Sequence, residues 1–113
     1  MSRASCVMRR VLPFVAAWAV AAAGPPPTER LVTVTQKDRA FGVRDIQMER
    51  GGTVRFINED DFPHQINVRG NGLNTESGLQ GPGETIEVAL PLVGDFAVRC
   101  GIHPRMRMTI HAL

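Results

Sequence analysis

Four side chains able to bind a soft metal ion lie close together near the C-terminal end of the sequence. Cys100 is followed by His103 and then by Met106, with Met108 two positions further on. A thiolate, an imidazole and a weakly binding thioether suit copper that cycles between Cu(I) and Cu(II). The run lacks a second nitrogen ligand, and His64, which begins a distant strand-like segment, can supply it. Two histidines and a cysteine in a plane with a distant methionine form a blue-copper electron-transfer site.

The axial ligand is left open between the two methionines. Met108 lies in phase with Ile110 and Ala112 and is therefore also compatible with a place in the core. Met106 gives the shorter loop after Cys100 and leaves the last strand intact. We therefore favour Met106 and keep Met108 as the alternative.

Short strands must position these ligands. Apolar and polar residues alternate repeatedly after residue 30, and no segment keeps the apolar rhythm of a helix over three turns. The glycine pair at 51–52 is expected to end one strand, and the polar stretch 70–78 is expected to be a loop. About seven or eight strands in roughly 90 residues indicate a single all-β sandwich domain. The predicted strands span residues 31–35, 43–49, 53–58, 64–69, 85–90, 95–100 and 106–112.

The N-terminal segment has the composition of a secretory signal peptide. Three arginines precede the apolar run 11–23, which ends in three alanines. A membrane-spanning helix needs ~20 apolar residues, so this run is short, and Pro13 interrupts it. We expect cleavage after Ala23 and a periplasmic or secreted protein without a membrane span, with a retained anchor as the alternative. The predicted organisation is a signal peptide at 1–23, a Pro-rich leader at 24–30 and a copper-binding domain at 31–113.

Removing residues 1–23 changes the charge and the cysteine count. The whole chain of 113 residues has 13 Lys and Arg against 11 Asp and Glu, a formal charge of +2. Three arginines leave with the signal peptide, so the remainder has 10 basic and 11 acidic residues, and its charge gives no argument for binding nucleic acid. Cys6 leaves as well, so Cys100 has no disulfide partner within the chain. A lone thiol in an oxidising compartment favours a metal ligand.

Several segments together resemble the cupredoxins, most closely the amicyanin-like and plastocyanin-like single-domain members. They are the strand 54–58 leading to His64, the turn Pro-Gly-Glu at 82–84, the run 94–100 (GDFAVRC) and the Cys-x-x-His-x-x-Met loop. The resemblance implies a Greek-key β-sandwich that holds one copper ion and passes single electrons between redox proteins. It also implies Met106 at the spacing of amicyanins or Met108 at the longer spacing of plastocyanins and pseudoazurins.

The resemblance assigns further roles. Asn58 is expected to tie the loop before His64 to the cysteine strand. His103 is expected to reach the surface inside an apolar patch where a donor and an acceptor dock briefly with a monomeric protein. Arginines near this end either steer an acidic partner or are ordinary solvated side chains. The expected docking patch consists of Phe62, Pro63, Ile102 and Pro104, and the arginines are Arg99, Arg105 and Arg107.

One position departs from the family pattern. Many relatives have proline immediately before the loop histidine, where this chain has Ile102. Ile102 keeps a backbone N–H, which we expect to donate to the Cys100 sulfur and to lower the reduction potential. His111 faces outward in the last strand and is expected to be a solvated side chain.

Two other classes of function compete with electron transfer. Copper delivery or tolerance would use the same ligands. An enzyme is disfavoured because an activated cysteine usually lies at a helix N-terminus, whereas Cys100 ends a predicted strand.

Overall fold

A computed structural model describes Pro13 and residues 29–113 of the chain. The predicted signal peptide and its cleavage point, and the leader as far as residue 28, lie outside these residues apart from Pro13. None of the described residues forms a helix long and apolar enough to cross a membrane. Glu29 and Arg30, which the sequence places in the leader, already belong to the first strand.

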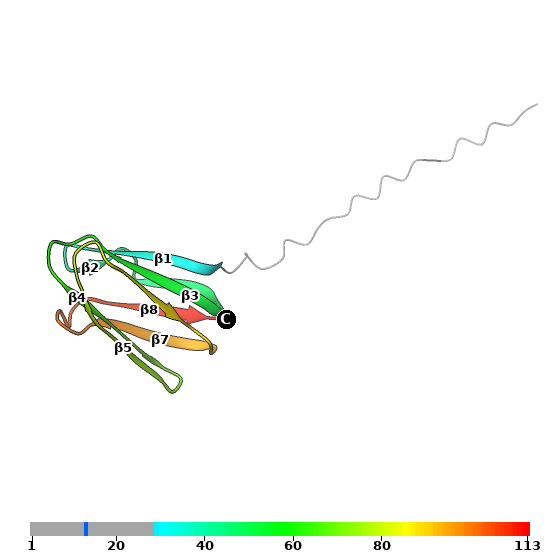
Figure 1. Cartoon of the computed structure of the whole chain (residues 1–113). Coiled ribbons are helices and arrows are strands. Elements are labelled where there is room, and N and C mark those ends of the chain that lie inside the picture. The colour runs from blue at the N-terminus through cyan, green and yellow to red at the C-terminus, as the bar shows by residue number, and fades with distance from the viewer. Residues whose placement is uncertain (1–12, 14–28) are drawn as a thin grey trace, which may run out of the picture.

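The described part of the chain folds entirely into strands and their connections (Figure 1). This confirms the predicted all-β fold of about eight strands. The strands are β1 (Glu29–Lys37), β2 (Ala40–Phe41), β3 (Asp45–Asn58), β4 (His64–Gly70), β5 (Leu73–Gln80), β6 (Thr85–Ala89), β7 (Gly94–Cys100) and β8 (Arg107–Ala112).

Strand β3 links the two layers of the sandwich. Its first half pairs in parallel with β8, and its second half pairs with β1 and β6. The ladder continues from β8 through β7 and β4 to β5. The prediction that the glycine pair at 51–52 ends a strand is wrong. Gly51 adopts a φ of 80°, which glycine tolerates, and the chain bulges there and continues as the same strand.

The segment 70–78, predicted to be a loop, is mostly strand β5. Asn71 and Gly72, with φ values of 42° and 79°, form a two-residue turn that folds β5 back onto β4. Positive φ at both central residues is the geometry of a tight hairpin turn. Most side chains of β5 are exposed, so the segment lacks the apolar alternation that reveals a strand in sequence.

The core lies between the two layers and is made of alternate residues of each strand. Phe56 and Met48 of β3 and Phe96 of β7 are fully buried. Burying a side chain of this size contributes about 1.5–3 kcal/mol. The buried row of β7 continues through Val98 to Cys100, so the core reaches the thiol directly.

His111 of β8 is more constrained than the sequence suggested. Its Nδ1 lies 2.6 Å from a carboxylate oxygen of Asp95, and its Nε2 lies 3.0 Å from one of Asp45. The prediction of an outward-facing, solvated side chain holds in part: the side chain is 32% exposed, but both ring nitrogens are hydrogen-bonded. The two hydrogen bonds raise the pKa of His111 above its ordinary value of 6.5, more than burial lowers it. His111 thus joins the start of β3 to the start of β7.

Candidate metal centre

Strands β4 and β7 bring the first two ligands together. The antiparallel register places Ile66 opposite Cys100, and His64 begins β4 two residues earlier. Because alternate residues of a strand share a face, His64 and Ile66 both point into the core. Both His64 and Cys100 are at most 1% exposed. Pairing of two strands far apart in sequence therefore places an imidazole beside the thiol.

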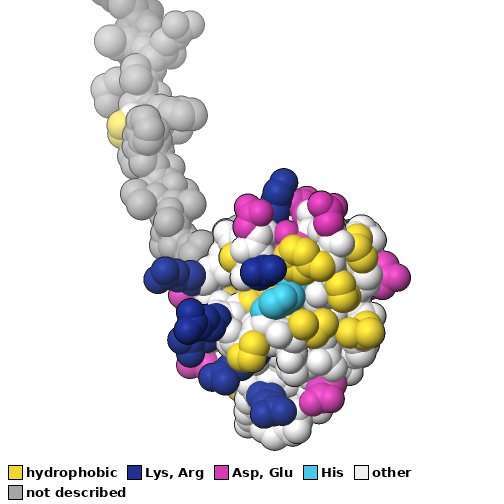
Figure 2. Space-filling view, turned by 90° about the vertical axis from the view of Figure 1, so that its left-hand side faces the viewer, with side chains coloured by type: hydrophobic (Ala, Val, Ile, Leu, Met, Phe, Trp, Pro, Cys, Tyr) yellow, Lys and Arg dark blue, Asp and Glu magenta, His cyan; other side chains and the backbone are white. Residues whose placement is uncertain are grey.

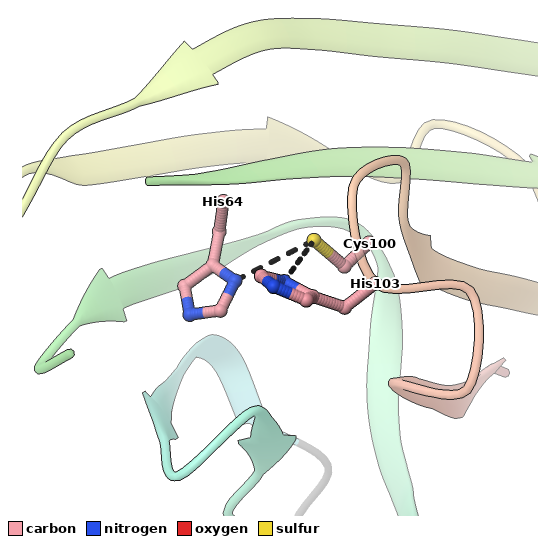
Figure 3. Close-up of side chains that lie close together, drawn as sticks. All are labelled: His64, Cys100 and His103. Atoms are coloured by element: carbon pink, nitrogen blue, oxygen red, sulfur yellow. Dashed lines mark hydrogen bonds between the residues drawn. The ribbon is translucent and has the colours of Figure 1, made fainter. Parts of the chain in front are cut away.

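The third ligand returns on the loop between β7 and β8. The N–H of Met106 donates to the carbonyl of His103 at 2.9 Å, and the N–H of Cys100 donates to the carbonyl of Met106 at 3.0 Å. These two bonds close the loop into a tight turn. Figure 3 shows His103 from this turn and His64 from β4 both directed at the cysteine sulfur.

The donor atoms are spaced to bind one metal ion. The Cys100 Sγ lies 3.5 Å from Nδ1 of His64 and 3.7 Å from Nδ1 of His103. All three atoms lie within 4.8 Å of one another. Metal–nitrogen and metal–sulfur bonds of about 2.0 and 2.3 Å at a trigonal angle of about 120° require nearly this separation. The residues present therefore fit a copper ion bound by one thiolate and two imidazoles.

Asp60 determines which nitrogen of His64 is available. Its buried carboxylate lies 2.7 Å from Nε2 of His64. An ionised carboxylate only accepts hydrogen bonds, so Nε2 must carry the proton and Nδ1 presents its lone pair to the site. A carboxylate behind a metal-binding histidine fixes the orientation of the ring and raises its basicity. Asp60 thus prepares His64 as a ligand before any metal binds.

The same carboxylate is tied to the turn between β1 and β2. The N–H groups of Asp38 and Arg39 donate to Asp60 at 2.6 and 3.2 Å. Burial alone would raise the pKa of Asp60, but the hydrogen bonds from His64, Asp38 and Arg39 outweigh it and hold the pKa below its ordinary value. The carboxylate is therefore ionised and held from three sides.

Three rings meet where His103 approaches the surface. The ring of Phe62 lies edge-to-face with those of His64 and His103, at centroid distances of 5.3 and 5.4 Å. The guanidinium of Arg39 lies 5.2 Å from the Phe62 ring centre. Burial lowers the pKa of His103, and the neighbouring His64 and Arg39 lower it further. The rings of His64 and His103 also lie 5.3 Å apart, so Phe62 packs against both ligand rings and restricts their movement.

The predicted roles of Asn58 and Ile102 are corrected by the structure. The Asn58 side chain donates to the carbonyls of Phe62, Gln80 and Gly81, so it joins the loop before His64 to the end of β5 and not to the cysteine strand. Across residues 29–113, the backbone N–H that donates to Cys100 Sγ belongs to Gln65, at 3.5 Å, and Ile102 makes no such bond. Gln65 also accepts from the N–H of Gly101 at 3.1 Å, which makes it the link between β4 and the ligand loop.

The two candidate methionines lie in different places, although both are buried. Met106 is in the ligand loop, with its backbone bonded to both Cys100 and His103. Met108 is in β8, opposite Val98.

The expected docking patch lies around His103 at this end of the molecule. Pro63, Ile102 and Pro104 are exposed and Phe62 is half-buried. Figure 2 shows hydrophobic side chains surrounding an exposed histidine on this face, with a basic side chain directly beside it.

Asp60 and Gln65 are the site residues that sequence reasoning missed. Asp60 stands in an acidic run of three residues that looks like an ordinary polar loop. Its spacing of four residues from His64 was the available signal. Gln65 acts mainly through its backbone, so its residue type gave no indication.

Residues 28–112 match the model of one protein family, described as copper binding proteins of the plastocyanin/azurin family. The methylamine utilization protein MauL of Methylophilus methylotrophus is 31% identical over 80 residues, which cover 68% of this chain and 46% of that protein. The chain spans about half the length of the curated relatives it matches.

Solved structures share the fold. A Cu-containing nitrite reductase (NirK) from Thermus scotoductus superposes with a TM-score of 0.67 and 26% identity, covering 84% of this chain but 24% of that one. A Cu(I) form of an amicyanin variant superposes with a TM-score of 0.69 and 16% identity over 78% of this chain and 87% of that one.

Proposed function

Because the chain belongs to the plastocyanin/azurin family of copper-binding proteins, we propose that it carries single electrons between redox partners through one copper ion. The observation that carries this proposal is the preformed group of His64, Cys100 and His103, whose donor atoms lie within 4.8 Å of one another. Bound copper supplies the one-electron Cu(I)/Cu(II) couple.

The ligand set of this proposal is Nδ1 of His64, Sγ of Cys100, Nδ1 of His103 and the thioether of Met106. Met106 is favoured over Met108 because its backbone is bonded to Cys100 and His103, whereas Met108 is opposite Val98 in the sheet. A ligand in the loop can approach the metal without displacing a strand residue from the core.

The protein's own part is to keep the ligands still. The Asp60 carboxylate fixes the ring of His64, the N–H of Gln65 donates to the sulfur, and the ring of Phe62 packs against both imidazoles. Electron transfer is fast when little rearrangement accompanies the change of charge. A site held from several sides suits a carrier better than a delivery protein, which must release its metal.

We assign the electron's exit to the exposed side of His103. Phe62, Pro63, Ile102 and Pro104 form an apolar surface around it, on which a donor or acceptor can dock. Redox encounters bury little area and separate quickly, which a small apolar patch permits. A docked partner's cofactor comes closest to the copper ligands at His103.

We assign no catalytic role to the chain. The likeness to a nitrite reductase covers 24% of that enzyme, so it reflects one part of a larger protein. In the part of this chain that the structure describes, one group of His, Cys and acidic side chains is close enough to hold a metal. For location, the signal-peptide composition of residues 1–23 supports export, and the mass of the N-terminal peptide of the purified protein tests it.

Copper titration followed by voltammetry tests the proposed function. Adding Cu(II) should produce an intense blue charge-transfer band that is lost in Cys100→Ser and strongly altered in His64→Gln. His111→Gln is the matched control, because it removes a histidine outside the site and should leave the band unchanged.

Fast and reversible voltammetry would then identify a carrier. A blue band combined with slow electron exchange and ready transfer of Cu(I) to a chelator would instead indicate copper delivery. A colourless copper complex would contradict the proposed site.

A further inference from the structure

Four arginines surround a hollow on the side of the molecule next to the ligand loop. The hollow has a volume of about 580 Å³, and its lining includes Ala97 and Thr109. All four arginines are exposed. We call this surface the arginine hollow, and its arginines are Arg44, Arg99, Arg105 and Arg107.

The positive charge of the arginine hollow is not neutralised within the described chain. The arginines that form ion pairs within residues 29–113 are Arg30, Arg55 and Arg69, and none of them belongs to the hollow. One acidic residue, Asp45, lines the hollow, and its carboxylate is engaged by His111. The hollow therefore presents four guanidinium groups and one carboxylate that is already paired.

This arrangement is unfavourable for the folded protein by itself. Arg99 of β7 and Arg107 of β8 are directly opposite in the antiparallel ladder. Like charges at such positions repel each other and destabilise the sheet. Elsewhere in the same fold an opposite-charge pair occupies such positions. Arg55 of β3 is opposite Glu87 of β6 and forms an ion pair with it at 2.9 Å. A negative group that binds from outside would relieve the repulsion in the hollow.

The arginine hollow adjoins the proposed exit of the electron. Arg99 directly precedes the ligand Cys100, and Arg105 lies between His103 and Met106 and also lines the hollow beside His103. Figure 2 shows basic side chains gathered at the left and lower edge of this face, whereas most acidic ones lie at its upper and right-hand edge. A docked protein would thus be oriented as well as attracted.

We propose that the arginine hollow binds an acidic surface segment of the redox partner and so sets the orientation in which that partner covers His103. This inference rests on the proposed electron-carrier function. Guanidinium groups bind carboxylates in a fixed, often bidentate geometry, which suits side chains of Asp and Glu. Complementary charge raises the rate of encounter and orients the partners, while the apolar patch forms the close contact.

The test compares two variants of equal net charge in the copper-loaded protein. Arg99→Gln/Arg107→Gln removes two charges from the hollow, and Arg30→Gln/Arg50→Gln removes two charges outside it. The probe is a c-type cytochrome with an acidic surface, mixed by stopped flow with the reduced protein. The ferric haem gains the one electron that the protein's Cu(I) loses, and no proton or group moves.

At low ionic strength we expect the hollow variant to react about tenfold more slowly than the wild type, within the range by which steering accelerates encounters. The control variant should stay within about twofold of the wild type, since its lost charges lie outside the docking site. The difference should disappear near 1 M salt, where the Debye length is about 3 Å. Equal slowing of both variants would overturn the proposal, because it would show an effect of net charge alone.

Two further measurements distinguish protein docking from the binding of small anions and from a failure of the copper site. Phosphate binding to each variant is measured beside the cytochrome reaction. If the hollow substitutions weaken phosphate binding but leave the cytochrome rate unchanged, the hollow is a small-anion site and the proposal fails. The blue band and the electron exchange with an uncharged electrode are recorded for every variant. Their absence in the wild type would overturn the electron-carrier function itself, whereas their presence with no effect of Arg99 and Arg107 would overturn only the docking proposal.

Discussion

At the scale of single residues, Asp60 is the side chain on which the geometry of His64 depends most. Asp60→Asn keeps the shape of the side chain but removes its negative charge. It also replaces one of the two carboxylate oxygens, which can only accept hydrogen bonds, with an NH2 group, which donates. We expect Cu(II) affinity to fall by about 10–100-fold, as for other partners of metal-binding histidines. We also expect a higher reduction potential, because the lost negative charge favoured Cu(II). Competition titration and voltammetry measure the two effects.

The neighbouring Asp61 provides the control. It is exposed, and Asp61→Asn changes the net charge by the same amount without touching a ligand. Equal effects of the two substitutions would show that Asp60 acts through charge at a distance and not through its hydrogen bond to His64.

Two single substitutions test the choice between the two methionines as axial ligand. Met106→Leu should raise the reduction potential and shift the visible spectrum, because it removes a thioether from the ligand loop. Met108→Leu should leave the spectrum unchanged and cost less than about 1.5 kcal/mol of stability, as volume-conserving core substitutions do. A spectral shift in Met108→Leu alone would reverse the assignment.

The ligands were predictable from sequence because copper requires particular atoms. Cys100 and His103 were adjacent in one motif, and the structure places His64 beside them as expected. The supporting groups were less predictable. Asn58 binds the loop before His64 as expected, yet its other hydrogen bonds lead to the end of β5. The backbone N–H of Gln65 donates to the sulfur, where that of Ile102 was expected to. Side-chain type identifies a ligand, whereas a backbone N–H is common to almost every residue and becomes significant only through the fold.

At the scale of strands, one repulsive and one attractive cross-strand pair allow a matched comparison of the free energy of unfolding. Arg107→Thr removes the repulsion with Arg99, and we expect it to raise the free energy of unfolding by about 0.5 kcal/mol. Arg55→Thr removes the attractive pair with Glu87 and should lower it by a similar amount. Urea denaturation measures both, and the opposite signs exclude a general effect of removing arginine. If Arg107→Thr destabilised the protein, the four arginines would have to be neutralised in a way the described contacts do not show.

Strands were predictable where one face is buried and one is exposed. β7 shows this alternation from Asp95 to Cys100, and it was found at nearly its observed length. β5 was missed because most of its side chains are exposed and no apolar alternation marks it, and the continuity of β3 was missed because Gly51 looks like a strand end. In both cases the structure is determined by hydrogen bonds with strands that are distant in the sequence. A local sequence pattern carries no information about those bonds.

At the scale of the whole molecule, His111 makes stability depend on pH. Its pKa is raised in the folded state, so folding favours the protonated form. The stabilisation is full below the unfolded pKa, near the ordinary value of 6.5, and is lost as the pH rises through the folded value. We therefore expect the Tm difference between wild type and His111→Gln to be largest near pH 6 and to shrink towards pH 9. Calorimetry across this range tests it, and a difference that grows with pH would contradict the assignment.

The register that places Ile66 opposite Cys100 also determines when the copper site can exist. Two further strands, β5 and β6, lie between β4 and β7 in the chain. Such non-local pairings form slowly, in about milliseconds to seconds, because the intervening loop must close first. Until β4 and β7 have paired, His64 is not held beside the thiol of Cys100, and the three donor atoms do not form a trigonal arrangement. The trigonal set of donors is thus a product of folding, because it is complete only once β4 and β7 have paired.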